Sequence, residues 1–115
     1  MVCKKIFDLY DVNDKPWIVY LRAVSGQYVE FFYGGERLLE SDSKSIFFVH
    51  MCFEVDNVKE VAARITNARM KVVSEPKIGK DYGEHCMAKD PDSNFIEFMT
   101  MNSEAPQMTG KMKTN

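Results

Sequence analysis

The chain has 115 residues, of which 45% are hydrophobic and 28% charged, and its formal net charge is −2. This length suits one globular domain, and the scattered Lys and Arg residues create no basic surface for nucleic acid. No apolar run reaches the roughly 20 residues of a membrane-spanning helix. Residues 1–11 lack the apolar segment of a secretory signal, and the three cysteines form no CxxC pair. We therefore expect a cytoplasmic protein that binds neither nucleic acid nor membrane.

The first third of the chain predicts three strands. Residues 5–11 read as a short strand, and residues 17–24 are aromatic and β-branched. The Ser25-Gly26 turn signal then leads into a third strand over residues 27–33. The polar residues 36–44 predict a linker.

A strand and a helix follow this linker. Residues 45–55 are mostly apolar and predict a long strand. Asn57, with Glu60 three residues later, resembles a capping box at the start of a helix over residues 57–70. One apolar stripe recurs along this helix at Val58, Val61, Ala62, Ile65 and Ala68.

Three strands and a tail complete the chain. The strands are expected over residues 71–74, 84–89 and 95–101, with a Pro- and Gly-containing loop over residues 75–83. Residues 102–115 are polar and without periodicity, so they predict a flexible tail.

The prediction of the fold rests mainly on an internal repeat. An offset of 67 residues places Glu97 over Glu30 and aligns residues 22–32 with residues 89–99. The pattern [Tyr/Phe]-[Val/Ile]-Glu-Phe occurs in both stretches. A repeat at a fixed offset indicates two copies of one supersecondary unit. We therefore predict an α+β fold of paired βαβββ modules, with the opening strand and most of the helix absent from the first module.

This interpretation sets the expected organisation of the chain. One domain covers residues 1–101, with a partial first module (1–35), a linker (36–44) and a second module (45–101), followed by the tail (102–115). A sheet that lacks a strand exposes backbone donors and acceptors along an edge. We therefore expect a homodimer that covers this edge.

Glu30, His50 and Glu97 are the candidate metal ligands. Each lies on a predicted strand among apolar neighbours, where a buried and unpartnered carboxylate is costly. Convergence on a divalent cation removes that cost, and oxygen and nitrogen ligands suit Zn, Ni, Co, Mn or Fe(II). The solvent-facing side of an alternating strand explains any one of these residues, but the recurrence of Glu at the 67-residue offset favours a site.

Arg22, Tyr20 and Phe48 are candidates for substrate binding. Arg22 and Tyr20 share the face of Glu30 in a regular hairpin, and Phe48 shares that of His50. An exposed cross-strand pair is the simpler explanation of Arg22 and Tyr20, and it is favoured over substrate binding. His85, beside Glu84 at the start of a predicted strand, is interpreted as peripheral.

These residues carry a family resemblance. The runs VHMCFEV (49–55) and DPDSNFIEF (90–98) resemble the second module of the glyoxalase / bleomycin-resistance / extradiol-dioxygenase (vicinal oxygen chelate) superfamily. Its "DPDGN.IE" signature has glycine at the position of Ser93. The resemblance covers nearly all of residues 4–101 and implies an incomplete barrel around a metal. It is closest to lactoylglutathione lyase-like proteins, in which Glu30, His50 and Glu97 match three metal ligands and the fourth belongs to the missing strand.

The resemblance also implies a function. We expect a metal-dependent lyase or isomerase that acts on a small carbonyl or thiohemiacetal-type substrate, with Glu97 as general base and Glu30 as the opposed carboxylate. Ile46 and Gly34 occupy the positions of an arginine and an asparagine that bind glutathione in that branch. Three alternatives remain: a non-catalytic small-molecule-binding protein, an inactive truncated member, and an Fe(II) dioxygenase that takes a His from the missing strand.

Overall fold

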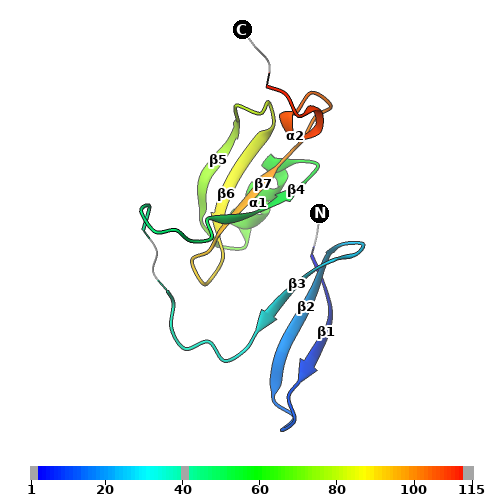
Figure 1. The fold of residues 1–115 in the computed structure, drawn as a ribbon, viewed down its shortest axis with the longest axis vertical. Helices are drawn as coiled ribbons and strands as arrows, with labels where there is room; N and C mark the ends of the chain where they lie inside the picture. Colours follow the sequence, from blue (N-terminus) through cyan, green and yellow to red (C-terminus); the bar gives the residue numbers. More distant parts are fainter. Residues whose placement is uncertain (1–2, 40–41, 113–115) are drawn as a thin grey trace. The chain divides into compact units, whose positions relative to one another are not determined.

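The computed structural model describes residues 3–39 and 42–112. The chain divides into two compact units, Met1–Lys44 and Ser45–Asn115. The first unit contains an antiparallel sheet in the order β1-β2-β3 (Figure 1). Its strands are β1 (Lys4–Tyr10), β2 (Pro16–Val24) and β3 (Gln27–Phe32).

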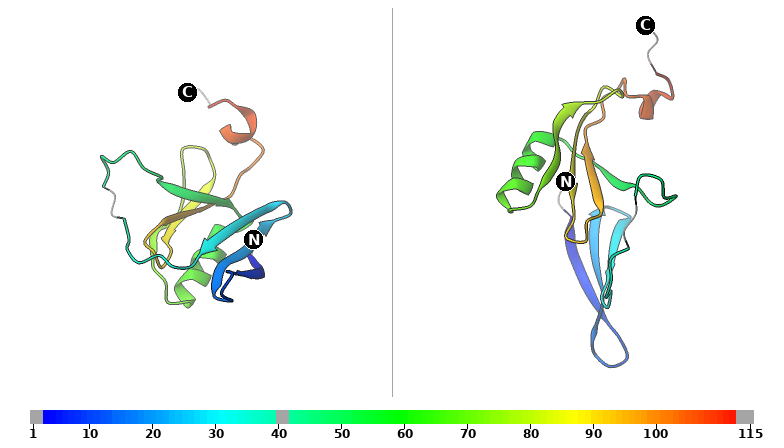
Figure 2. Two further views of the ribbon diagram at one scale, coloured as in Figure 1. Left: turned by 60° about the horizontal axis from the view of Figure 1, so that its bottom comes forward. Right: turned by 90° about the vertical axis from the view of Figure 1, so that its left-hand side faces the viewer.

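The second unit has the complete βαβββ order. It consists of β4 (His50–Glu54), α1 (Val58–Asn67), β5 (Val72–Ile78), β6 (Glu84–Lys89) and β7 (Phe95–Met99). The sheet order is β4-β7-β6-β5, with β4 parallel to β7 and the other pairs antiparallel. Helix α1 packs on β5, β6 and β7 and covers one face of this sheet (Figure 2). Within the described residues, no helix is long and apolar enough to cross a membrane.

Helix α1 forms where the sequence predicts it. Asn57 is the N-cap with an extended backbone, and its side-chain oxygen accepts a hydrogen bond from the Glu60 N–H at 3.0 Å. Val58 and Ala62, one turn apart, are buried on the face that meets the sheet. The helix side of the sheet contributes the buried Cys86 and Ala88 of β6 to the same core.

The predicted repeat is present in the strand register. Tyr20 pairs with Glu30 across β2 and β3, and Met87 pairs with Glu97 across β6 and β7. Both residues of the second pair lie 67 positions after those of the first. The irregularity between Lys5 and Phe7 in β1 also recurs in β5, between Val72 and Ser74. The antiparallel segments β1-β2-β3 and β5-β6-β7 are therefore copies of one unit. This confirms the paired α+β fold.

Two strand boundaries differ from the prediction by more than two residues. The strand expected over residues 45–55 begins only at His50, because pairing with β7 starts at the first residue of that strand, Phe95. Strand β5 extends to Ile78, into the first part of the loop expected over residues 75–83, and contains Pro76. Proline is tolerated there because β5 is the edge strand of its sheet, where an N–H group without a ladder partner is acceptable.

The tail is more structured than its sequence suggests. Residues 102–115 contain a short helix, α2 (Pro106–Thr109), and the side chain of Ala105 before it is buried. The absence of periodicity gives no signal for a helix of one turn, because such a helix cannot show an apolar stripe. The division into modules, linker and flexible tail stays a prediction.

Candidate functional site

Glu97 lies in the middle of β7 and projects from the sheet face opposite α1. Its neighbour Phe98 pairs with the buried Cys86 and stacks on Phe53, with ring centroids 6.0 Å apart. Since successive side chains of a strand alternate between faces, Glu97 points the other way. Cys52 on β4 pairs with Glu97, so its side chain shares this open face.

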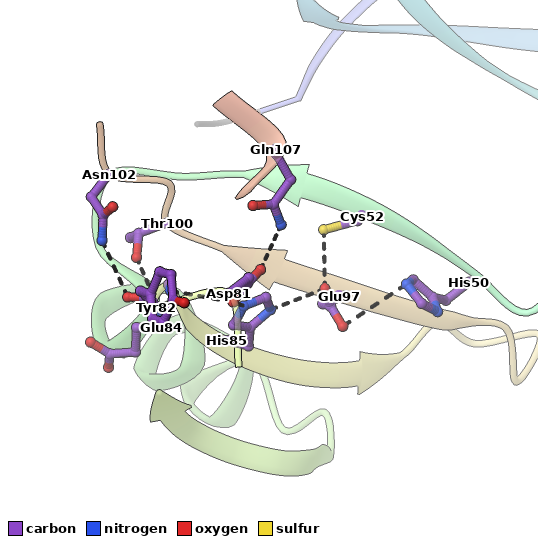
Figure 3. Close-up of polar contacts among 11 residues, drawn as sticks. His50, Cys52, Asp81, Tyr82, Glu84, His85, Glu97, Thr100, Asn102 and Gln107 are labelled. Carbon is purple, nitrogen blue, oxygen red and sulfur yellow. Dashed lines mark hydrogen bonds and ion pairs between the residues drawn. The ribbon is translucent and has the colours of Figure 1, made fainter. Parts of the chain in front are cut away.

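Three side chains converge on the Glu97 carboxylate (Figure 3). The Cys52 thiol donates a hydrogen bond to Oε1 at 3.4 Å, and His85 Nδ1 lies 3.1 Å from the same oxygen. His50 Nε2 lies 3.9 Å from the other oxygen, Oε2. The Glu97 side chain is 20% exposed and that of His50 is 33% exposed, so the group is half-buried but open to a ligand.

His85 bridges two carboxylates. Its Nδ1 faces Glu97, and its Nε2 lies 2.6 Å from Asp81 Oδ1. Partial burial of the ring lowers its pKa, but the hydrogen bonds with Asp81 and Glu97 outweigh this effect and the pKa of His85 is raised. The protonated ring donates from both nitrogens, one to each carboxylate.

Asp81 connects His85 to the C-terminal segment. Its Oδ2 accepts a hydrogen bond from Gln107 Nε2 of α2 at 2.6 Å, and its Oδ1 accepts one from the Gly83 N–H at 3.3 Å. Burial raises the pKa of the Asp81 carboxyl, but the hydrogen bonds from Gln107, His85 and Gly83 outweigh it and the pKa is lowered. A continuous polar chain therefore runs from Gln107 through Asp81 and His85 to Glu97.

The loop between β5 and β6 requires glycine at both ends. A Cβ on Gly79 would lie 2.9 Å from Cδ2 of His85, and one on Gly83 would clash with the Thr100 carbonyl oxygen. The Gly79 N–H donates to the Gly83 carbonyl at 2.8 Å and closes the loop. The two glycines therefore let the loop pack directly against the imidazole and the end of β7.

Cys52 is held as a neutral thiol. Partial desolvation and the hydrogen bond to Glu97 raise its pKa to about 12. A thiol with this pKa carries almost no thiolate at neutral pH, so Cys52 serves as a hydrogen-bond donor and not as a nucleophile.

Glu30 occupies the equivalent position in the first unit. It pairs with Tyr20, and a hydrogen bond between the two side chains raises the pKa of the Tyr20 phenol. The Tyr20 ring also stacks on Phe7, with centroids 4.5 Å apart. Arg22 pairs with Tyr28 two residues along the same face, as the sequence predicts. Glu30 and Arg22 are both exposed.

The predicted site residues thus fall into two groups. His50 and Glu97 come together in the second unit, where Phe48 lies just before β4 and is 58% exposed. Tyr20, Arg22 and Glu30 share one face of the sheet in the first unit. The assignment of Glu30, His50 and Glu97 to one metal and of Arg22, Tyr20 and Phe48 to one substrate stays a prediction.

The interpretation of His85 as peripheral is wrong. The 67-residue repeat gives no signal for it, because Ile18 occupies the matching position of β2. The position of His85 beside Glu97 follows instead from the register of the hairpin that β6 and β7 form. Met87 pairs with Glu97, so His85, two residues away on the same face, lies diagonal to the carboxylate and within reach of its side chain.

The donor set fits a divalent metal in part. His50 and Glu97 offer a nitrogen and an oxygen to one location, which suits a borderline transition-metal ion. Across residues 3–39 and 42–112, no group of three His, Cys, Asp or Glu side chains is arranged to hold a metal. A complete site at His50 and Glu97 would therefore need a further ligand.

The fold and these residues can now be compared with known proteins. The family model described as "Glyoxalase/Bleomycin resistance protein/Dioxygenase superfamily" matches residues 5–98. The chain belongs to this superfamily. No curated protein gives a significant match to it.

Several solved structures share the fold of this chain. TioX from Micromonospora sp. ML1 is 16% identical with a TM-score of 0.64, over 87% of this chain and 80% of that one. Lactoylglutathione lyase from Agrobacterium tumefaciens is 16% identical with a TM-score of 0.59, over 85% and 75% of the two chains. A glyoxalase family protein from Enterococcus faecalis is 16% identical with a TM-score of 0.67, over 84% and 77%. At these identities the likeness establishes the fold, which hosts several activities.

Proposed function

We propose that this glyoxalase-superfamily chain is a metal-dependent lyase or isomerase that acts on a small carbonyl or thiohemiacetal-type substrate. The observation that supports this proposal best is the approach of His50 Nε2 to Glu97 Oε2, 3.9 Å apart on the open face of the second module. Glu30 supports it further, because this residue is at the register-equivalent position of the first module.

Each residue would have a distinct role. A divalent cation held by Glu30, His50 and Glu97 would supply Lewis-acid polarisation of a substrate carbonyl. Glu97 would move the proton next to that carbonyl as general base, with Oε2 as the reactive atom because Oε1 is engaged by Cys52 and His85. Tyr20 and Arg22 would bind the polar end of the substrate, and Phe48 would contact its apolar part.

Metal content is the direct test of this proposal. Elemental analysis of protein purified without an affinity tag and dialysed against Ni, Co, Zn or Mn is expected to find near-stoichiometric metal. His50→Ala is expected to lose it, because His50 supplies the one nitrogen among the three proposed ligands. Met51→Ala is the matched control, since Met51 is next to His50 on β4 but alternates to the other face. Wild-type protein without metal would instead favour a non-catalytic binding module.

Activity gives a second criterion. The metal-loaded protein is to be assayed for isomerisation of hemithioacetals formed from a 2-oxoaldehyde and a series of thiols. Glutathione is only one member of that series, since Ile46 and Gly34 lack the polar groups expected of a glutathione site. Full activity of Glu97→Ala would exclude the general-base role.

A further inference from the structure

Within the described residues, hydrogen bonds hold the Glu97 carboxylate at one of its two oxygens. The Cys52 thiol and His85 Nδ1 both reach Oε1, whereas Oε2 faces His50. A carboxylate held at one oxygen has its rotation about the last side-chain bond restricted. The direction of the free oxygen is therefore set by whichever residue holds the other.

His85 is the more strongly fixed of these two donors. The Asp81 carboxylate holds the far side of its ring at 2.6 Å, and Gln107 holds Asp81 at 2.6 Å. Gly79 packs against the ring so closely that it leaves no room for a Cβ. The imidazole is therefore held by polar contacts at both nitrogens and by the loop backbone against its edge (Figure 3).

From this geometry we infer that His85 is a positioning residue: through Nδ1 it fixes the Glu97 carboxylate so that Oε2 is presented beside His50. The inference rests on the proposed function, because the position of Oε2 matters through the metal and the proton that Glu97 would handle. Hydrogen-bond partners of this kind orient a ligand and tune its basicity, and their loss typically lowers metal affinity by about 10- to 100-fold.

Two substitutions of His85 separate its contact with Glu97, which would position the carboxylate, from its contact with Asp81, which holds the ring. In His85→Asn the amide nitrogen lies near the place of Nδ1, so a donor to Glu97 is kept and the contact with Asp81 is lost. In His85→Gln the amide nitrogen lies near the place of Nε2, so the contact with Asp81 is kept and the donor to Glu97 is lost. Each variant loses one hydrogen bond of the same network.

The measurement is the dissociation constant for Co(II), by calorimetric titration of the metal-free full-length chain, together with the visible Co(II) absorption spectrum. We expect about a 10-fold weaker affinity and an altered spectrum for His85→Gln, and an affinity within about twofold of wild type for His85→Asn. Urea unfolding of both metal-free variants shows whether the fold is retained.

The outcomes are distinguishable. Wild-type affinity and spectrum in His85→Gln would overturn the inference and leave the proposed function standing. Equal weakening in both variants, in proportion to their loss of stability, would reduce His85 to a structural role and also overturn it. A wild-type chain that takes up no Co(II), Ni(II), Zn(II) or Mn(II) would overturn the proposed function, and the inference with it.

Discussion

Glu30 and Glu97 hold the same position in two copies of one hairpin, each opposite the residue ten positions before it, Tyr20 and Met87. The copies differ in what stabilises the carboxylate. In the first, the cross-strand partner Tyr20 hydrogen-bonds to Glu30. In the second, the cross-strand partner is apolar and the donors come from β4 and from His85. The repeat therefore conserves the acidic group while each module supplies its own partners.

This equivalence predicts that both carboxylates are needed for metal uptake. Glu30→Gln and Glu97→Gln keep the shape of the side chain but remove the charge that attracts a cation. Each is expected to lower the affinity for Ni(II) or Co(II) by at least about 10-fold, measured by calorimetric titration. Glu36→Gln, a substitution in the polar segment after β3, is the control. If Glu30→Gln binds metal like wild type, the ligands come from the second unit without Glu30.

Much of the fold could be predicted because local and repeated patterns agree. The Asn57 cap and the apolar stripe after it define α1, and the 67-residue offset defines the hairpins through their common register. The start of β4 could not be predicted in this way. Residues 45–49 are as apolar as a strand, but β7 offers pairing partners only from Phe95 onward. The length of a strand depends on where its partner strand offers backbone hydrogen bonds, and composition alone does not show this.

The site could be predicted only in part. The positions of Glu97 and His50 on strands predict them as site residues, and the two side chains do come together. The sequence does not predict Asp81, His85 and Gln107 as a group, because their contacts span a loop, a strand and the tail helix. A polar network of this kind depends on how segments distant in sequence pack together.

Cys52 offers a direct probe of the Glu97 environment. A thiol with a pKa near 12 is almost entirely protonated at pH 8, so alkylation by iodoacetamide should be slow although the side chain is exposed. Glu97→Gln removes the negative charge and the charged acceptor, which lowers the pKa of Cys52 and should speed alkylation about 10-fold. The rate is followed by peptide mass spectrometry on metal-free protein, with Cys86, which is buried, as an internal reference. An unchanged rate in Glu97→Gln would contradict the hydrogen bond.

Gly83 is expected to tolerate no side chain. An added Cβ would clash with the Thr100 carbonyl oxygen, and a backbone atom directly after β7 cannot move without disturbing the sheet. Gly83→Ala should therefore lower the free energy of unfolding by about 2–3 kcal/mol, measured by urea denaturation. Gly35→Ala is the matched control, because no atom lies within 4 Å of its added Cβ. Equal stability of the two variants would show that the loop is free to shift.

Asp81 should make stability depend on pH in the acid range. Its pKa is lower in the folded chain than in the unfolded one, because Gln107, His85 and the Gly83 N–H stabilise the charged form against the opposing effect of burial. A lowered pKa means that the contribution to stability is present above about pH 3.9, the unfolded value, and is lost as the pH falls through the folded value. Wild type should therefore have a higher urea midpoint than Asp81→Asn at pH 5.5, where the Asp81 carboxylate is charged.

The same comparison at lower pH tests the cause of this difference. As the pH falls below about 3.9, the unfolded chain takes up a proton at Asp81, whereas the folded chain does so only at a lower pH because its pKa is lowered. The wild-type midpoint should therefore approach that of Asp81→Asn as the pH falls through the folded value. The Asn amide keeps an oxygen for the Gly83 N–H and His85, but its NH2 group faces the Gln107 amide, so the substitution removes both the charge and the acceptor for Gln107. Gln107→Ala should reduce the difference at pH 5.5 without abolishing it, because His85 still stabilises the carboxylate. A difference that stays constant between pH 5.5 and the acid limit would mean that Asp81 acts through its shape and not through its charge.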